Sequence, residues 1–241
     1  MKQILLFSAF IICLAGTLKA QDDRPNVIKL NLPALGLQNF SFQYERGLTD
    51  KVSAVLGVSV MPGRSLPTIV IDEADEDILV DNFRMSGFAI TPEFRFYPGS
   101  NREAPRGFYL GGYVRYSNYA VTSLYPYEGE TLDFRARWSG VGAGFSLGAQ
   151  WYIGERVTID WLILGVHAGA SMPKMRLTGA EIERIQNTPG DREALIADIE
   201  SFDLPFGRVE ANYDDSRTVS AKIMGIPFLG LRSGLSVGIA F

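Results

Sequence analysis

Six charged residues occupy positions at which a β-strand would turn them away from its apolar face. Successive side chains of a strand point to opposite faces, and each of the six lies in a segment of alternating polarity. If such strands close into a narrow barrel, the charges meet inside it and must pair, because an unpaired buried charge costs several kcal/mol. They then form either a static ion-pair network or a gate whose pairs exchange partners and open a narrow ion path. The residues are Lys29, Glu45, Glu93, Arg95, Arg115 and Arg232.

A second charged cluster is purely acidic and lies between two predicted strands. Carboxylate oxygens are suitable ligands for Ca²⁺, but the spacing matches no EF-hand loop and the glycine of that loop is missing. We interpret the cluster as a solvated external loop, with cation binding as the alternative, and predict no metal site and no cofactor. Its residues are Asp72, Glu73, Asp75, Glu76, Asp77 and Asp81.

Two arrangements suggest nucleophilic catalysis, but neither has the required context. Residues 144–148 read Gly-Phe-Ser-Leu-Gly and fit G-x-S-x-G, a motif that works only at a sharp strand-to-helix turn, whereas Ser146 lies in mid-strand. His167 shares a strand face with Ser171, about 13 Å away along an extended strand. We therefore predict no catalytic residues, and an esterase acting on lipid A or phospholipid remains a lesser alternative.

The elements that carry these residues are predicted to be β-strands. Apolar and polar residues alternate in several long segments, and the polar face is rich in Gly and Ser, which suits the crowded interior of a small barrel. The pattern predicts an all-β fold, an antiparallel up-and-down transmembrane β-barrel of about eight strands. The predicted strands are 26–33, 38–45, 51–61, 84–97, 107–119, 131–152, 156–169 and 217–241.

Short turns alternate with long loops, as in outer-membrane barrels with periplasmic turns and external loops. The predicted long loops are 62–82, 120–131 and 171–216. In the last of these, residues 178–181 resemble a capping box that opens one helix, and Thr188 is expected to cap a second helix with Leu195, Ile199 and Phe202 on one face. We predict a helical extracellular cap over 178–202 that packs on the barrel rim, with partner binding as the functional alternative.

Residues 1–20 resemble a cleaved export signal, with Lys2 before an apolar core that is too short for a spanning helix. A lipoprotein site at Cys13 is a lesser alternative. We therefore divide the chain into a signal peptide, 1–20, and one barrel domain, 21–241. The net charge of −4 argues against a nucleic-acid partner, and one His and one Cys exclude a multi-ligand His/Cys zinc site.

Several segments together resemble a known family. The run Phe42-Gln-Tyr-Glu-Arg-Gly-Leu-Thr-Asp-Lys is followed by Thr91-Pro-Glu-Phe-Arg-Phe-Tyr-Pro and by a C-terminal Leu235-Ser-Val-Gly-Ile-Ala-Phe. The chain resembles Bacteroidota-type outer-membrane β-barrel proteins grouped as a domain of unknown function. This resemblance implies the fold and an outer-membrane location, but no activity. The last segment also resembles the signal read by the barrel assembly machinery. Its recognised face would be Leu235, Val237, Ile239 and Phe241.

The sequence thus predicts a non-enzymatic barrel of the cell outer membrane, with a mostly filled interior and a structural or surface-interaction role. The alternatives are a narrow ion or small-solute channel, the esterase, and a soluble periplasmic β-sandwich or lipocalin-like binder. The expected partners are outer-membrane lipid, the assembly machinery and an extracellular partner of loop 171–216.

Overall fold

The computed structural model describes residues 26–65, 83–99, 104–127, 130–201 and 207–241. The predicted signal peptide therefore lies outside the described residues. None of the helices in the described part is long and apolar enough to span a membrane. In chain order the elements are β1 (Asn26–Asn31), α2 (Leu32–Gly36), β2 (Phe40–Gly47), β3 (Val52–Ser65), β4 (Arg84–Phe96), β5 (Gly107–Tyr127), β6 (Glu130–Ile153), β7 (Val157–Thr178), α3 (Ala180–Asn187), α4 (Asp191–Glu200), β8 (Arg208–Asp215), β9 (Thr218–Met224) and β10 (Gly230–Ala240).

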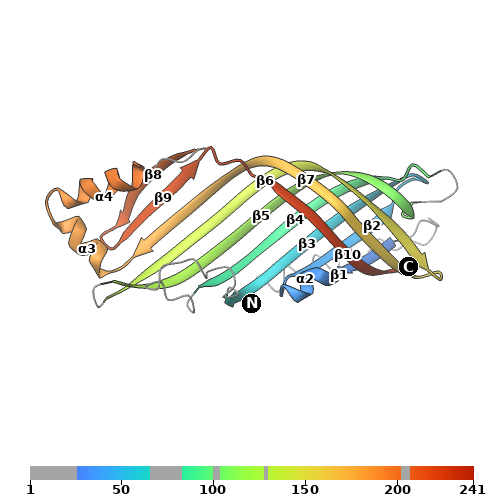
Figure 1. The fold of residues 1–241 in the computed structure, drawn as a ribbon, viewed down its shortest axis with the longest axis horizontal. Coiled ribbons are helices and arrows are strands. Elements are labelled where there is room, and N and C mark those ends of the chain that lie inside the picture. Colours follow the sequence, from blue (N-terminus) through green and yellow to red (C-terminus); the bar gives the residue numbers. More distant parts are fainter. Residues whose placement is uncertain (1–25, 66–82, 100–103, 128–129, 202–206) are drawn as a thin grey trace, which may run out of the picture.

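Eight of these strands close into an antiparallel barrel (Figure 1). Strands β1 to β7 pair in chain order, and β10 pairs with β1 on one side and with β7 on the other. The predicted all-β barrel of eight strands is thereby confirmed. Asn26 and Phe241 exchange backbone hydrogen bonds, so the two ends of the barrel chain meet. We call this the turn end, because the β2–β3, β4–β5 and β6–β7 turns also lie there.

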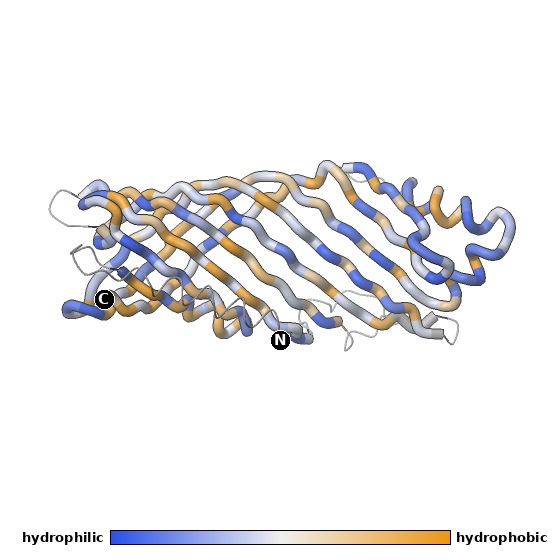
Figure 2. Tube along the Cα trace, turned by 180° about the vertical axis from the view of Figure 1, so that it is seen from behind, coloured by the Kyte–Doolittle hydropathy of each residue, from blue (hydrophilic) through white to orange (hydrophobic). Residues whose placement is uncertain are grey.

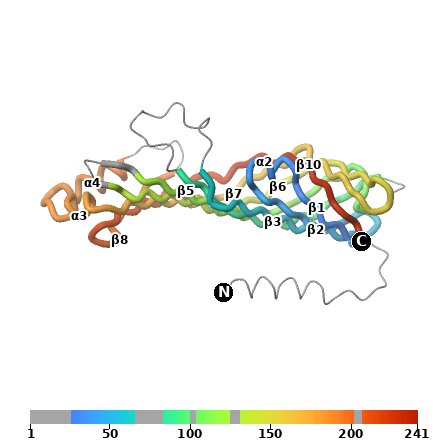
Figure 3. Tube along the Cα trace, turned by 90° about the horizontal axis from the view of Figure 1, so that it is seen from below, coloured from blue at the N-terminus to red at the C-terminus, as the bar shows by residue number. Residues whose placement is uncertain are grey.

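Strands β5, β6 and β7 run far beyond the barrel at the opposite end. They contain 21, 24 and 22 residues, about twice what a tilted strand needs to cross a bilayer. There β9 replaces β10 as the neighbour of β7, and β8 pairs with β9. We call this extension the protruding sheet: residues 118–127, 130–139 and 172–178 together with β8 and β9. Figure 3 shows the barrel at the end that carries the C-terminus and the extension at the other.

The protruding sheet corrects two predicted loops and one predicted strand. Segment 120–131 is not a loop, because β5 and β6 stay paired up to Tyr127 opposite Glu130. In 171–216, the first residues belong to β7 and residues 208–215 form β8. Segment 217–241 is two strands, since the chain turns at Gly225, whose φ is +85°, and Pro227 has no N–H to donate to a ladder.

The predicted helical segment is present as α3 and α4, but neither predicted cap forms. The Thr178 hydroxyl instead contacts the Thr218 hydroxyl at 3.1 Å across β7 and β9, and Gly179 stands at the N-cap of α3. Thr188 ends α3 and donates its hydroxyl to the Arg184 carbonyl at 3.0 Å. The pairing of β7 with β9 therefore takes precedence over the local capping motif.

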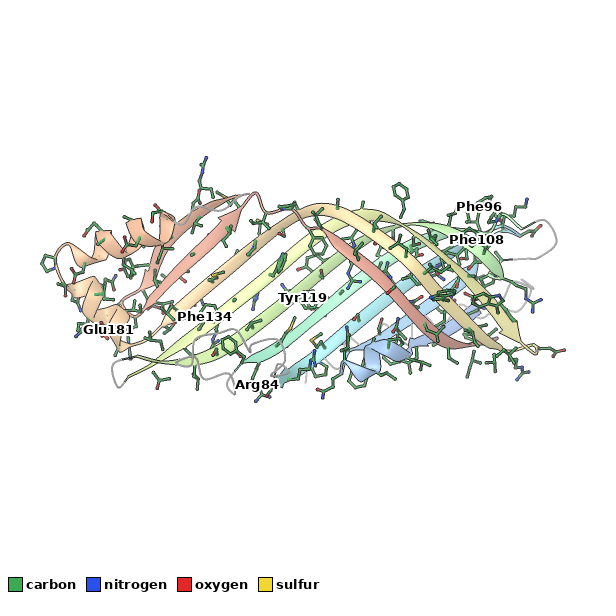
Figure 4. All side chains as sticks on the ribbon, viewed as in Figure 1. Arg84, Phe96, Phe108, Tyr119, Phe134 and Glu181 are labelled. Carbon is green, nitrogen blue, oxygen red and sulfur yellow. The ribbon has the colours of Figure 1, made fainter. Side chains whose placement is uncertain are left out.

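The two helices lie at the tip of the protruding sheet and not on the barrel rim (Figure 1). Helix α4 packs on β8, where the Ala211 backbone N–H donates to Glu200 Oε1 at 3.0 Å. Ile182 of α3 is buried, and Glu181 of the same helix lies beyond Phe134 in Figure 4. At the β8–β9 turn, the backbone N–H of Arg217 donates to Asp215, which lowers the pKa of that carboxyl.

The faces of the strands exchange polarity where the barrel ends. Figure 2 shows hydrophobic and hydrophilic residues alternating along the strands. Within the barrel the outward side chains are mostly apolar and the inward ones are small or polar, whereas along β6 and β7 in the protruding sheet the outward side chains become charged and the opposite ones become apolar. Along β6 the outward series is Trp151, Leu147, Phe145, Val141, Ser139, Arg137 and Arg135, and the inward series is Gln150, Ser146, Gly142, Trp138, Ala136 and Phe134.

We predict that the barrel folds without α3 and α4. Replacement of residues 180–200 by a short Gly-Ser linker is expected to leave β-sheet circular dichroism and compact migration on unboiled gels close to wild type. The physical reason is that both helices pack mainly on each other and on the protruding strands. Loss of the compact form in this variant would show that the tip is needed for barrel folding.

Candidate functional site in the barrel interior

Every barrel strand turns polar side chains into the interior, and these form one connected network. The alternation of the strands places them there, since residues two apart share a face. Most of them are almost completely buried. The contributions are Lys29 from β1, Gln43 and Glu45 from β2, Ser53 from β3, Glu93 and Arg95 from β4, Tyr109 from β5, Ser146 and Gln150 from β6, Asp160 from β7 and Arg232 from β10.

Lys29 of β1 is the first of two central cations, and it contacts side chains from β2, β6 and β7. Its ammonium group donates to Asp160 Oδ2 at 2.5 Å, to Gln150 Oε1 at 2.5 Å and to Glu45. An ammonium has three N–H groups, so these contacts use all of them. Because the acceptors come from β2, β6 and β7, this single side chain links strands on opposite sides of the barrel.

Arg95 is the second central cation. Its guanidinium donates to Asp160 Oδ2 at 2.6 Å and to Glu93 Oε1 at 2.9 Å, and its carbon lies 4.1 Å from the centroid of the Tyr109 ring. The Tyr109 hydroxyl donates to the other oxygen of Asp160 at 3.0 Å. Asp160 is therefore the shared acceptor of two cations and one phenol.

The charges of the network balance. Among the described residues, Lys29, Arg95 and Arg232 face Glu45, Glu93 and Asp160, and Arg232 reaches Glu93 at 3.9 Å. Neutral hydroxyls give the carboxylates further hydrogen bonds. The Tyr97 hydroxyl donates to Glu45 at 2.7 Å, and the Ser146 hydroxyl donates to Glu93 at 2.7 Å. Multiple hydrogen bonds are what allow buried ion pairs to offset the loss of hydration. In this arrangement each of the three carboxylates accepts from at least one cation and one neutral hydroxyl.

Inward glycines create the room for these side chains. A Cβ atom on Gly111 would lie 2.7 Å from Glu93 Oε1 and collide with the Ser146 hydroxyl, and one on Gly148 would lie 2.5 Å from the Tyr109 ring. Real Cβ atoms do not approach other atoms this closely, so the glycines and the network depend on each other.

Aromatic rings pack against each other near both ends of the interior. At the turn end, the ring centroids of Tyr97 and Tyr109 lie 5.7 Å apart. Ala104 and Pro105 are buried at the same end. At the other end, Phe228 donates its backbone N–H to Gly169 and packs on His167 with 4.8 Å between ring centroids. A Cβ on Gly140 would lie 2.5 Å from the Phe228 ring, so the absence of a side chain at Gly140 leaves the space that this ring occupies.

His167 and Ser171 are not paired. His167 faces the interior, where its Nδ1 lies 3.2 Å from the Tyr113 hydroxyl, and only 8 % of the residue is exposed. Ser171 donates its hydroxyl to the Ile226 carbonyl at 3.0 Å. Ser146 donates to Glu93 within the network. None of the three has the geometry of an activated nucleophile on the outer surface.

Of the six charges predicted to point inward, five belong to the network and Arg115 lies beside it. Arg115 donates to Thr91 Oγ1 at 3.0 Å and forms no ion pair with the described residues. The sequence interpretation missed Asp160, although Val157, Ile159 and Trp161 alternate with Thr158 and Asp160. It also missed Tyr97, which is buried and donates its hydroxyl to Glu45.

The remaining predicted sites lie elsewhere. The acidic cluster, residues 72–81, falls outside the described residues, and the described part holds no group of three His, Cys, Asp or Glu side chains that could bind a metal. The outward face of β10 carries the predicted assembly signal. Leu235, Val237, Ile239 and Phe241 are between 37 % and 62 % exposed.

The fold and its interior define a class: a closed eight-stranded β-barrel whose interior holds a charge-balanced central network of buried side chains. The chain belongs to the family described as protein of unknown function, DUF3575, whose model matches residues 6–172. This match covers the strands from β1 to most of β7 and ends before α3, α4 and β10. No curated protein and no solved structure matches the chain.

We predict that Asp160→Asn strongly destabilises the barrel. The change leaves three buried cations with two carboxylates, and breaking a buried pair typically costs about 3–5 kcal/mol. Urea unfolding of the refolded protein, followed by tryptophan fluorescence, measures the effect. The matched control is Asp133→Asn, an exposed partner of Arg135 at 3.8 Å, for which we expect about 0–1 kcal/mol. Equal midpoints for the two variants would contradict the proposed importance of the network.

Neighbouring glycines give a second test. Gly111→Ala is expected to lower the free energy of unfolding by about 1–3 kcal/mol, as overpacking does in tight cores. Gly112→Ala is the control, since a Cβ there meets nothing within 4 Å. The same urea titration compares them, and an unaffected Gly111→Ala variant would mean that the interior is loosely packed.

Proposed function

We propose that the protein is an outer-membrane β-barrel with a closed lumen, which anchors the protruding sheet at the cell surface in a structural or surface-interaction role. The observation that carries the proposal is the polarity of the barrel: its charges are inside and its large apolar side chains are outside. Phe145 is 77 % exposed and Leu231 79 %, and exposed apolar residues occur on every barrel strand. Soluble monomers rarely expose such continuous apolar surface.

The height of this apolar belt fits a membrane. Along β6 the outward apolar series extends from Val141 to Trp151, and a tilted membrane strand needs about 9–11 residues. Figure 4 shows Phe96 and Phe108 at the turn end of the same belt. A soluble β-sandwich or lipocalin-like binder would instead place its charges on the outside.

The ends of the barrel suggest an orientation. The chain termini and the short turns share one end, which corresponds to the periplasmic side of an outer-membrane barrel with an even number of strands. We propose that the protruding sheet faces the exterior and that residues 1–20 direct export. The outward apolar face of β10 is consistent with recognition by the assembly machinery.

The protruding sheet supports the surface-interaction role. Its apolar face carries a groove of about 400 Å³, and Trp138 and Met175 in this groove are 47 % and 41 % exposed. Tyr119, which Figure 4 labels, is another of the residues that line it. An apolar surface of this kind, outside the membrane, is where a partner would bind.

We predict that the folded protein does not conduct. In planar bilayers it is expected to give no discrete openings, because the ion pairs and the aromatic rings near both ends occupy the interior. A wide-lumen porin in the same bilayer is the positive control, and compact migration on unboiled gels verifies folding. Discrete openings of the folded protein would overturn the closed-lumen proposal in favour of the narrow channel.

A further inference from the structure

The outward face of the protruding sheet carries a concentration of basic side chains directly beyond the apolar belt. On β6 the outward series changes from Val141 through Ser139 to Arg137 and Arg135. On β7 it changes from Met172 to Lys174 and Arg176. All four basic residues are exposed, and β9 adds the exposed Lys222.

The strand register aligns these charges with each other. Arg137 lies opposite Lys174, which in turn lies opposite Lys222 on β9, and Arg135 lies opposite Arg176. Directly opposite residues in an antiparallel pair have Cβ atoms about 4.5–5.5 Å apart, and like charges at such positions are destabilising. We call Arg137, Lys174 and Lys222 the cationic row.

The cationic row has no intramolecular counter-ion among the described residues. Arg135 contacts Asp133 at 3.8 Å and Arg176 contacts Asp214 at 2.7 Å, so the next row is neutralised. Glu210 lies opposite Lys222 but forms no ion pair with it within the described part of the chain. The row therefore aligns three cations with a single carboxylate, that of Glu210 at its end, and keeps an excess of positive charge that favours an anion from outside the chain.

The position of the row indicates the chemical class of that anion. Met172 and Met224 lie on the same outward face, are 62 % and 39 % exposed, and continue the apolar belt up to the row. An amphiphile whose acyl chains lie along the belt would place its phosphate at the edge of the belt. Arg binds phosphate in a bidentate manner, and Lys binds it as a point charge.

We propose that the cationic row binds the phosphate groups of lipids in the membrane leaflet that surrounds the protruding end. This inference rests on the proposed membrane location. The row then sets how deep the barrel sits, because it holds the start of the protruding sheet at the headgroup level. Basic residues near an anionic membrane surface each contribute appreciably to its binding.

The test compares two kinds of vesicle. The protein is refolded into phosphatidylcholine vesicles with and without a lipid that carries phosphate monoesters, such as lipid A, and its thermal unfolding midpoint is measured on unboiled gels. We expect the phosphorylated lipid to raise the midpoint of the wild type. The double variant Arg137→Gln with Lys174→Gln is expected to lose most of this shift, while its midpoint in phosphatidylcholine stays equal to or above that of the wild type, because like charges on opposite residues have been removed.

The matched control removes two cations at the tip, Arg192→Gln with Arg217→Gln. Arg192 stacks on Tyr213 and Arg217 pairs with Glu183, so both have partners within the chain. This control should keep the full shift. An unchanged shift in the Arg137/Lys174 variant, an equal loss in the control, or the same shift with free inorganic phosphate would overturn the lipid site. Failure to insert into either kind of vesicle would instead overturn the proposed function.

Discussion

A charged side chain enclosed by an eight-stranded barrel has no bulk water to solvate it, so its partners must come from the other strands. The ammonium of Lys29 and the guanidinium of Arg95 both depend on Asp160, which lies more than sixty positions further along the chain. This requirement constrains the register of every strand, because a shift by one residue would turn the charges toward the outside. The glycines and phenols of the interior are consequences of the same constraint, since they provide space and additional hydrogen bonds.

The same strands obey the opposite rule beyond the barrel. Beyond the point where β10 stops pairing with β7, the inward residues of β6 change from Gly142 to Trp138. The outward residues of β6 change there from Val141 to Arg137. The first rule suits a protein with lipid outside and a packed polar interior, and the second suits a sheet in water with one polar face and one apolar face that a partner can bind. The exchange occurs in neighbouring strands together, so it marks a change of environment along the molecule.

Much of the barrel could be predicted from the sequence, because alternation depends only on the period of two in a strand. The face of Glu93 and Arg95 follows from their apolar neighbours. Their hydrogen-bond partners could not be predicted in the same way, because Asp160 reaches Arg95 only when the barrel closes. Segments such as 171–178 resembled loops because their polarity is reversed relative to the barrel, so that Lys174 and Arg176 appeared to interrupt the pattern. The first predicted helix cap failed for a related reason, because the pairing of β7 with β9 occupies Thr178.

We infer that the outward face of β6 passes from lipid to water between Val141 and Arg137. The chain contains a single cysteine, Cys13, in the predicted export signal, which makes site-specific labelling direct. We would place single cysteines at Phe145 and at Arg135, fold each protein into vesicles, and measure the rate of reaction with a water-soluble maleimide. We expect rapid labelling at position 135 and strong protection at position 145, and we expect a lipid-phase quencher to quench a label at position 145. Equal rapid labelling at both positions would contradict a membrane-spanning barrel.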